Sequence, residues 1–485
     1  MKRILFFLCV GLLFVNCKDD TKLTDTQELY KYVNDWVYQN MDALYYWNTK
    51  LPASQSTYEN PTDYFKTLKY KDDRFSAIFE SYQDILNELN GVSTSEIGFD
   101  FQLYKESSTN DNILGIVLYL KPGTPAASLG IKRGDIFRKI NGQQITMTNY
   151  SNLINYFSDS SASASVTFST YQNGSFYDKA AVTLNKTANY QEDPIYLDTV
   201  YTVQNKKIGY LIYNFFTGDS GDKSMKYDLE LISTIGRFKQ ENISELIVDL
   251  RYNHGGAMSS AINLSSMLVP NLTSDKVFSY IEYNQNYTDY FNSADFKKQY
   301  NENPFINNFA TTIEASYPSS HSYSIENVGN NLQRIFFLTS NGTASASEMV
   351  INGLKPFLPC VLIGDTTVGK NVGSTLVNDD KNTKNQWAIL PIILKYFNTD
   401  HKSDFTDGFA PDFRVDDDYS YQLGDTREAM LGKAINRISG VQSSAAKSAP
   451  INRLLWKSTI DFKPIRNGLI VRNKSIDSYL NRNKK

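Results

Sequence analysis

The apolar residues near the N-terminus recur at the spacing of an α-helix. Between Leu29 and Tyr45 they follow one another mostly at intervals of three and four, after a cluster of N-capping residues at 24–26. Two shorter helices are predicted over 61–68 and 82–89. Residues 24–90 are therefore predicted to form a short helical N-terminal domain.

The pattern changes to short strands after residue 90. Apolar runs separated by Gly- and Asn-containing turns predict strands over 115–120, 136–140, 166–171 and 179–184. The pairs Asn141-Gly142 and Asn173-Gly174 are typical of tight turns that join two strands. Residues 91–187 are therefore predicted to form a second domain around a small sheet.

A third pattern begins near residue 195, where the strands become nearly continuous apolar runs. Such runs cover 208–215, 246–250, 334–339 and 360–363, and helical periodicity covers 229–238 and the residues after 344. Strands buried on both faces are typical of a parallel sheet covered by helices. Residues 195–440 are therefore predicted to form an α/β core.

Two parts of the chain depart from this pattern. Residues 270–330 are rich in Asn, Tyr and Ser and poor in aliphatic residues, so we expect an insertion or lid with little sheet of its own. Pro391 is expected to mark a break or an edge in the run 387–397. Residues 441–485 are predicted to form a linker followed by a solvated basic tail.

The first 17 residues are typical of a targeting segment. Lys2-Arg3 precede an apolar run that ends at Cys17 and is too short to span a membrane. The segment resembles a bacterial lipoprotein signal, which implies acylation of Cys17; an ordinary secretory signal is the alternative. The acidic residues that follow Lys18 resemble a surface-export signal of some Gram-negative bacteria.

Composition and charge exclude several classes of function. The net charge of −3 gives no basic footprint for nucleic acid. The three histidines are scattered, and no Cys/His cluster has the spacing of a metal site, so we expect no metal and no other cofactor. Cys360 would be left without an internal partner and is predicted to be a buried small residue.

Candidate chemistry is concentrated between Ser340 and Gly373. Ser345 falls in or near the first turn of a predicted helix, where backbone N–H groups and the helix dipole stabilise negative charge. Ser345 and Glu348 also have the spacing of a capping box, which needs no catalysis. A buried Lys370, whose pKa burial would lower, could act as general base to a serine.

The second candidate element is the glycine turn after strand 246–250. Gly255-Gly256 would let a backbone approach a substrate closely, although a plain turn has the same composition. Asp249 within the strand could pair with Arg251. His254 could be the base of a Ser-His-Asp triad, but no residue near it supports that arrangement.

These motifs together resemble the C-terminal processing (tail-specific) serine peptidases. The matching segments are Thr-Ala-Ser345-Ala-Ser-Glu, Gly-Lys370 and Asp-Leu-Arg251-Tyr-Asn253-His-Gly-Gly. The resemblance implies a crotonase-like (ββα) core with an inserted or preceding PDZ domain. It also implies Ser345 as nucleophile, Lys370 as base, and an oxyanion hole formed with Gly255, Gly256 and Ala346. Where many members have a glutamine that orients the lysine, this chain has Ser374.

The resemblance extends to the second domain. Ile97-Gly98-Phe99-Asp100-Phe101 resembles the carboxylate-binding loop of a PDZ domain, in which backbone N–H groups hold a peptide C-terminus. The implied function is a lipid-anchored, extracytoplasmic serine endopeptidase that captures proteins by unfolded or C-terminal segments. Its implied place is the outer membrane of a Gram-negative bacterium, on the periplasmic or surface face. The alternative is a lipoprotein that binds a peptide or an apolar ligand without cleaving it.

Overall fold

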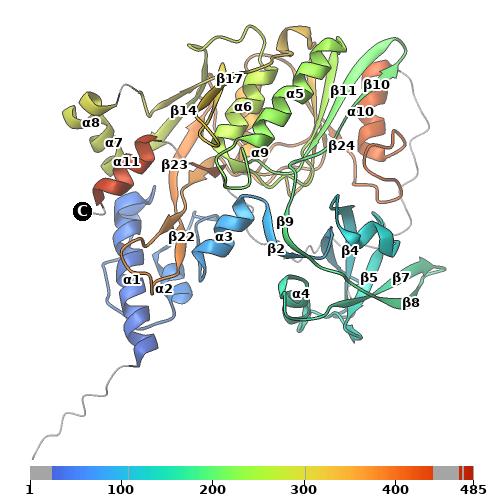
Figure 1. The fold of residues 1–485 in the computed structure, drawn as a ribbon, viewed down its shortest axis with the longest axis horizontal. Coiled ribbons are helices and arrows are strands. Elements are labelled where there is room, and N and C mark those ends of the chain that lie inside the picture. Colours follow the sequence, from blue (N-terminus) through green and yellow to red (C-terminus); the bar gives the residue numbers. More distant parts are fainter. Residues whose placement is uncertain (1–23, 108, 301, 441–468, 472–473, 484–485) are drawn as a thin grey trace, which may run out of the picture.

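The computed structural model describes residues 24–107, 109–300, 302–440, 469–471 and 474–483. The N-terminal helices and a small sheet lie side by side below a larger α/β core (Figure 1). The predicted signal segment with Cys17 and the predicted linker lie outside the described residues. The domain limits at 90, 187 and 440 stay predictions.

The three predicted N-terminal helices are confirmed. The N–H of Gln27 donates to the side chain of Thr24, the N-cap of the first helix, at 3.2 Å. Residues of this helix such as Val37 and Met41 belong to the same hydrophobic cluster as the core, so the region packs on the core. Its elements are α1 (Asp25–Leu44), η1 (Asn48–Lys50), α2 (Pro61–Leu68), β1 (Ala77–Phe79) and α3 (Tyr82–Leu89).

The predicted small sheet is antiparallel, with the strand order β3-β4-β5-β7-β8. Asn141-Gly142 and Asn173-Gly174 have positive φ, as two-residue hairpin turns require. Its elements are β3 (Phe99–Lys105), β4 (Ile113–Leu120), η2 (Pro125–Leu129), β5 (Ile136–Ile140), β6 (Gln143–Gln144), α4 (Tyr150–Ser158), β7 (Ser165–Gln172) and β8 (Ser175–Thr183). A separate pair, β2 (Val92–Glu96) and β9 (Thr187–Gln191), connects it to the rest of the chain.

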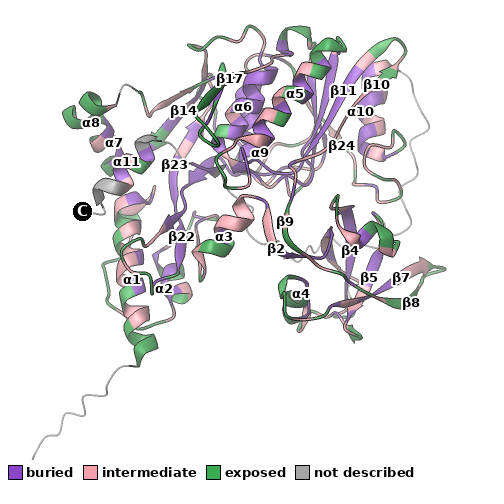
Figure 2. Ribbon diagram, in the orientation of Figure 1, coloured by how far each residue is buried: buried purple, intermediate pink, exposed green. Residues whose placement is uncertain are grey.

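The core contains a six-stranded sheet with the order β10-β11-β12-β18-β19-β24, in which all neighbours from β11 onward are parallel. Its strands are β10 (Ile195–Val203), β11 (Lys206–Tyr213), β12 (Glu245–Asp249), β18 (Ile335–Thr339), β19 (Cys360–Gly364) and β24 (Phe413–Arg414). One face is covered by α5 (Lys226–Gln240), α6 (Met258–Leu268) and α9 (Ala346–Leu354), and the other by α10 (Ala429–Ser439). The central strands β12 and β18 are buried along their whole length and β11 over most of it, whereas the edge strand β10 is mostly half-buried (Figure 2).

A second six-stranded sheet has the order β13-β25-β20-β23-β14-β15. Its strands are β13 (Gly256–Ala257), β14 (Val277–Tyr283), β15 (Ile306–Asn308), β20 (Val372–Ser374), β23 (Ile392–Phe397) and β25 (Leu469–Ile470). The predicted break at Pro391 is confirmed, because it separates β23 from β22 (Ala388–Leu390), which pairs with β1 and with β21 (Val377–Asn378).

The prediction that residues 270–330 have little sheet of their own is wrong. They contribute β14 and β15, a hairpin of β16 (Thr312–Ala315) and β17 (His321–Ser324), and the helices α7 (Gln285–Asn292), α8 (Ala294–Gln299) and η3 (Gly329–Asn331). Aromatic residues replace aliphatic ones in this segment: Phe278, Tyr283 and Tyr287 are buried in the main hydrophobic cluster.

The prediction of a solvated tail is wrong for its described residues. Val471 is fully buried beside β20, and α11 (Lys474–Asn483) buries Ile476 and Tyr479 against the core cluster. The apolar residues here are few and widely separated among basic ones. The composition of the segment therefore gave no sign that β25 and α11 pack on the core through single apolar side chains.

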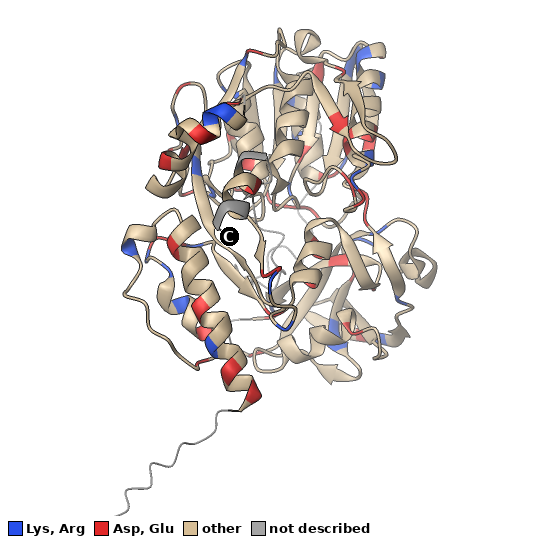
Figure 3. Ribbon diagram, turned by 60° about the vertical axis from the view of Figure 1, so that its left-hand side comes forward, with Lys and Arg blue, Asp and Glu red and all other residues tan. Residues whose placement is uncertain are grey.

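Charged residues of both signs are scattered over the ribbon (Figure 3), in line with the near-neutral net charge. Among the helices of the described residues, none is long and apolar enough to cross a membrane. Within the same residues no cluster of three or more His, Cys, Asp or Glu side chains is arranged to hold a metal ion.

Candidate active site

Ser345 lies at the junction between β18 and α9, directly before the first helical residue, Ala346. Its backbone has φ +61° and ψ −108°, a conformation that non-glycine residues rarely adopt and that is found mostly at functional sites. Ser345 and Glu348 form the predicted capping box, in which the Ser345 side chain faces the N–H of Glu348. The side chain is fully buried, and Oγ makes no hydrogen bond of standard geometry with the described residues. An unpaired buried hydroxyl is costly, so its retention favours a chemical role over simple capping.

Lys370 follows β19 and lies two residues before β20. Its side chain is fully buried, and burial lowers its pKa to about 7, although the carboxylates of Asp73 and Glu348 act in the opposite direction. The Nζ atom lies 5.0 Å from the centre of the Phe75 ring. A large fraction of Lys370 is therefore neutral at pH 7 and able to accept a proton.

The carboxylate of Glu348 joins the serine and lysine segments. Oε2 accepts hydrogen bonds from the backbone N–H groups of Ser345 and Lys370, both at 2.8 Å. Oε1 accepts from the Thr367 hydroxyl and the Gly369 N–H, both at 2.6 Å. Burial raises the pKa of Glu348, although the four donors act in the opposite direction. One buried carboxylate thus fixes the two candidate catalytic residues relative to each other.

The Glu348→Gln variant is expected to cleave peptides about 10²-fold more slowly, because an amide NH₂ would face N–H donors and displace both segments. Loss of the charge also lowers the pKa of Lys370, so the acidic limb of the pH–kcat/KM profile should move to lower pH. Glu348→Asp, which keeps the charge, is the control and should leave the limb near its wild-type position. If Glu348→Gln lowers kcat/KM at every pH but leaves the acidic limb at its wild-type pH, the proposed effect of Glu348 on the pKa of Lys370 is contradicted.

The glycine turn lies directly against the serine. A Cβ atom on Gly255 would lie 2.9 Å from Cβ of Ser345 and 3.2 Å from the nitrogen of Ala346, and φ is +109°. The Gly255 N–H donates to Oδ1 of Asn253 at 2.9 Å, and its carbonyl accepts from the N–H of Phe216. The Gly255 N–H is therefore already engaged, which leaves Gly256 as the donor that the turn can offer.

We expect Gly255→Ala to lower the rate of peptide cleavage by about 10²-fold, because the added methyl must push the Ser345 segment away and φ is strained. The comparison variant is Gly123→Ala, also at positive φ but with open space around it. Equal, small losses in kcat for the two variants would show that contact with Ser345 is unimportant.

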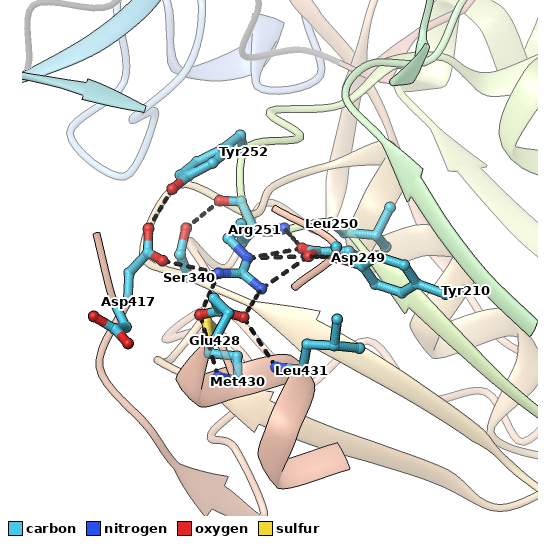
Figure 4. A network of polar contacts seen from close by, with 12 residues as sticks. Tyr210, Asp249, Leu250, Arg251, Tyr252, Ser340, Asp417, Glu428, Met430 and Leu431 are labelled. Atoms are coloured by element: carbon cyan, nitrogen blue, oxygen red, sulfur yellow. Dashed lines mark hydrogen bonds and ion pairs between the residues drawn. The ribbon is translucent and has the colours of Figure 1, made fainter. Parts of the chain in front are cut away.

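A network of buried charges surrounds Arg251, four residues before Gly255 in the chain (Figure 4). The guanidinium of Arg251 pairs with Asp249, as predicted, and with Glu428 at the start of α10 and Asp417, each at 2.8–2.9 Å. Arg133, from the small-sheet domain, binds the same Asp417 and the hydroxyl of Tyr252. The network therefore connects the small-sheet domain to the chain segment that carries Gly255.

The other candidate base from the sequence, His254, has one ring nitrogen engaged by the backbone of the Asn341-Gly342 turn. Nδ1 of His254 lies 2.6 Å from the carbonyl oxygen of Gly342, within the turn itself. Ser374 lies in β20 with its side chain fully buried and its Oγ without a hydrogen-bond partner among the described residues.

Two residues near Lys370 had no signal in the sequence. Asp73 and Phe75 lie close to its side chain in space, although they are about 300 residues earlier in the chain.

The predicted peptide-binding loop lies at the start of β3, the end strand of its sheet. Ile97 and Phe99 are buried, whereas Asp100 and Phe101 are half-buried, with the Phe101 ring 5.5 Å from that of Phe157 in α4. The N–H of Gly98 already donates to the Glu96 carboxylate at 2.8 Å. Capture of a peptide C-terminus here stays a prediction.

Comparison with known families agrees with this architecture. The model of peptidase family S41 matches residues 207–415, that of the S41 N-terminal domain matches 32–77, and a PDZ domain matches 116–169. The fold is that of a mixed α/β peptidase with an N-terminal domain and a PDZ domain. The two S41 models together cover more than half of the chain, which belongs to peptidase family S41 and is a peptidase.

Individual relatives are distant. The probable CtpA-like serine protease of Staphylococcus aureus strain N315 is 20% identical over 419 residues, 84% of this chain and 69% of that protein. Its counterpart in the bovine strain RF122 is 22% identical over 413 residues with the same coverage. The crystal structure of a putative S41 protease from Bacteroides fragilis NCTC 9343 has a TM-score of 0.64 at 23% identity, covering 84% of this chain and 98% of that one. The latter likeness shows the shared fold.

Proposed function

We propose that the chain is a serine endopeptidase of the C-terminal processing type, with Ser345 as nucleophile and Lys370 as general base. The observation that carries the proposal is the Glu348 carboxylate, which holds the backbone of both residues at 2.8 Å. Burial of Lys370, with a pKa of about 7, supplies a base of which a large fraction is neutral near pH 7.

In this mechanism neutral Lys370 takes the proton of Ser345 Oγ as the oxygen attacks the substrate carbonyl. The tetrahedral oxyanion is held by the N–H of Ala346, the first residue of α9, and by that of Gly256. Protonated Lys370 then gives its proton to the leaving amine, and an acyl-enzyme forms on Ser345. Water deprotonated by Lys370 hydrolyses this ester and regenerates the serine. Many members of the family have a glutamine at the position of Ser374, and it orients the lysine. We propose that the Ser374 hydroxyl orients Lys370 in this chain.

The substrates are proposed to be unfolded or C-terminal protein segments. Support comes from the PDZ domain match and from β3, whose outer edge is available for strand addition beside α4. The bond from Gly98 to Glu96 must then be exchanged for one to the substrate carboxylate. The alternative is a protein of the same fold that binds peptides without cleaving them.

The experiment compares the soluble form, residues 18–485, with its Ser345→Ala variant on unfolded peptides that end in apolar residues. Cleavage products are identified by mass spectrometry. Cleavage by wild type alone supports the proposal. Peptide that binds both forms and remains intact would favour the non-cleaving alternative.

We propose further that acylation of Cys17 anchors the protein to the outer membrane of a Gram-negative bacterium. The apolar segment that ends at Cys17 motivates this. In cells, Cys17→Ala is expected to move the protein from the membrane pellet to the soluble fraction. Recovery of the variant with the membranes would contradict the lipid anchor.

A further inference from the structure

The last described strand of the chain lies between two strands that extend from the candidate active site. In β25, Leu469 is aligned with Gly256 of β13 and Ile470 with Ser374 of β20, and both pairings are parallel. β13 begins at the residue after Gly255, which contacts Ser345, and β20 begins two residues after Lys370. The C-terminal segment therefore runs between the strands that leave the nucleophile and base regions.

The main-chain groups around β25 are those that a bound polypeptide would use. The N–H of Val471 donates to the carbonyl of Ser374 at 2.9 Å, and the Thr375 hydroxyl donates to the carbonyl of Val471 at 3.0 Å. On the other side, Gly255 and Ala257 bond to Phe216, so the N–H and C=O of the intervening Gly256 face β25. The proposed oxyanion donor thus points toward the tail.

Removal of β25 would leave space for one extended chain. Strands that flank a third strand lie about 9.5 Å apart, twice the usual strand spacing, and their facing N–H and C=O groups need partners. β13 and β20 would both have such unpaired edges. An extended segment entering between them could form the same hydrogen bonds that β25 forms now.

The tail is held in place by apolar contacts at and beyond this strand. Val471 is fully buried, and a Cβ atom added to Gly373 would lie only 3.0 Å from its Cγ2, so the valine packs closely on the glycine backbone. Beyond it, α11 lies beside α7 (Figure 1), with the Tyr479 ring 4.1 Å from that of Tyr287. The side chains of Ser345 and Lys370 are meanwhile fully buried, so no substrate can reach them in this arrangement.

We infer that the slot between β13 and β20 is the binding site for the main chain of the substrate, and that the protein's own C-terminal segment is its resident occupant. The partner that fits the slot is an extended polypeptide, parallel to both strands, with an apolar residue at the place of Val471. This inference rests on the proposed function. A tethered occupant has an effective concentration on the order of millimolar, so it competes strongly with free peptides.

The test is to weaken the tail in the full soluble chain. Val471→Asp places a charge in the buried position, and Thr375→Val removes only the hydroxyl that bonds the Val471 carbonyl. Both are expected to raise kcat/KM for apolar peptides, by about tenfold for Val471→Asp, mainly through a lower KM. Lys179→Gln, at an exposed position of β8 in the small sheet, is the control and should change neither constant.

A binding measurement separates this inference from the proposed chemistry. The same tail substitutions are placed in the Ser345→Ala background, and the affinity for a fluorescent peptide of residues 466–485 is measured by anisotropy. If the tail-weakened variants bind the fluorescent peptide more tightly, the slot is supported as a binding site. This holds even if no form cleaves peptides, and then only the proposed function fails. Cleavage by wild type with unchanged peptide binding and kcat/KM in both variants would overturn the inference and leave the proposed function intact. Should Val471→Asp not fold, Thr375→Val decides.

Discussion

Replacement of Lys370 by methionine is expected to lower kcat/KM for peptide cleavage by about 10²–10⁴-fold, the usual contribution of a general acid–base. Methionine fills a similar volume, and the side chain is fully buried beside the Phe75 ring, so the variant should fold. Steady-state cleavage of a fluorogenic peptide measures the loss. A variant that retains wild-type activity would exclude Lys370 as the base.

The same residue predicts how activity depends on pH. With a Lys370 pKa of about 7, kcat/KM should fall about tenfold for each pH unit below 7 and become level above about pH 8, since only the neutral amine accepts a proton. The residual activity of Lys370→Met should lack this limb. An identical limb in the variant would assign it to another group.

Lys370 also links stability to pH, independently of catalysis. Its pKa is lowered from 10.5 to about 7 in the folded state, so between these values the unfolded chain binds more protons than the folded one. The contribution of Lys370 to the free energy of unfolding therefore rises with pH across this window and is lost as the pH falls through it. Lys370→Met should remove that contribution in urea titrations at pH 7 and pH 9.

Arg251→Met is expected to cause the largest loss of stability, about 3–5 kcal/mol, which is typical when one partner of a buried ion pair is removed. The fully buried guanidinium pairs with Asp249, Glu428 and Asp417. All three carboxylates would lose their shared cation, and those of Asp249 and Glu428 are themselves almost inaccessible to water. Urea unfolding monitored by tryptophan fluorescence measures the change.

A matched control lies nearby in the chain. Arg427→Met removes an arginine whose ion pair with Asp425 is largely exposed to solvent, with 68% of the arginine side chain accessible. Exposed pairs contribute little to stability, so this variant should unfold close to wild type. Similar unfolding midpoints for the two variants would show that the buried network does not support the fold.

Local patterns predicted the elements well where one face of a helix or strand is apolar. The ends of α2 and α3, the parallel strands β12, β18 and β19, and the break at Pro391 all depend on interactions between near neighbours in the chain. The same reasoning placed Ser345 in or near the first turn of a helix, and the structure has it directly before that helix, close to Gly255.

The parts that sequence could not predict depend on contacts between distant segments. Glu348 had the spacing of a capping partner for Ser345, but its bonds to Gly369 and Lys370 cross from another loop. The interaction of Phe75 with Lys370 and the insertion of β25 beside β20 have no local signal. The strands within residues 270–330 were missed because many of their buried side chains are aromatic and few are aliphatic.

The most direct test of the account is the acylation of Ser345 by a fluorophosphonate probe, followed by intact-protein mass spectrometry and peptide mapping. The tail-weakened Thr375→Val form gives the probe access, and the rate is measured from pH 5.5 to pH 9. We predict a single adduct on Ser345 that forms with a midpoint near pH 7 and is strongly slowed by Lys370→Met. Labelling of Ser345 at the same rate and with the same pH dependence in Lys370→Met would contradict the Ser345–Lys370 mechanism.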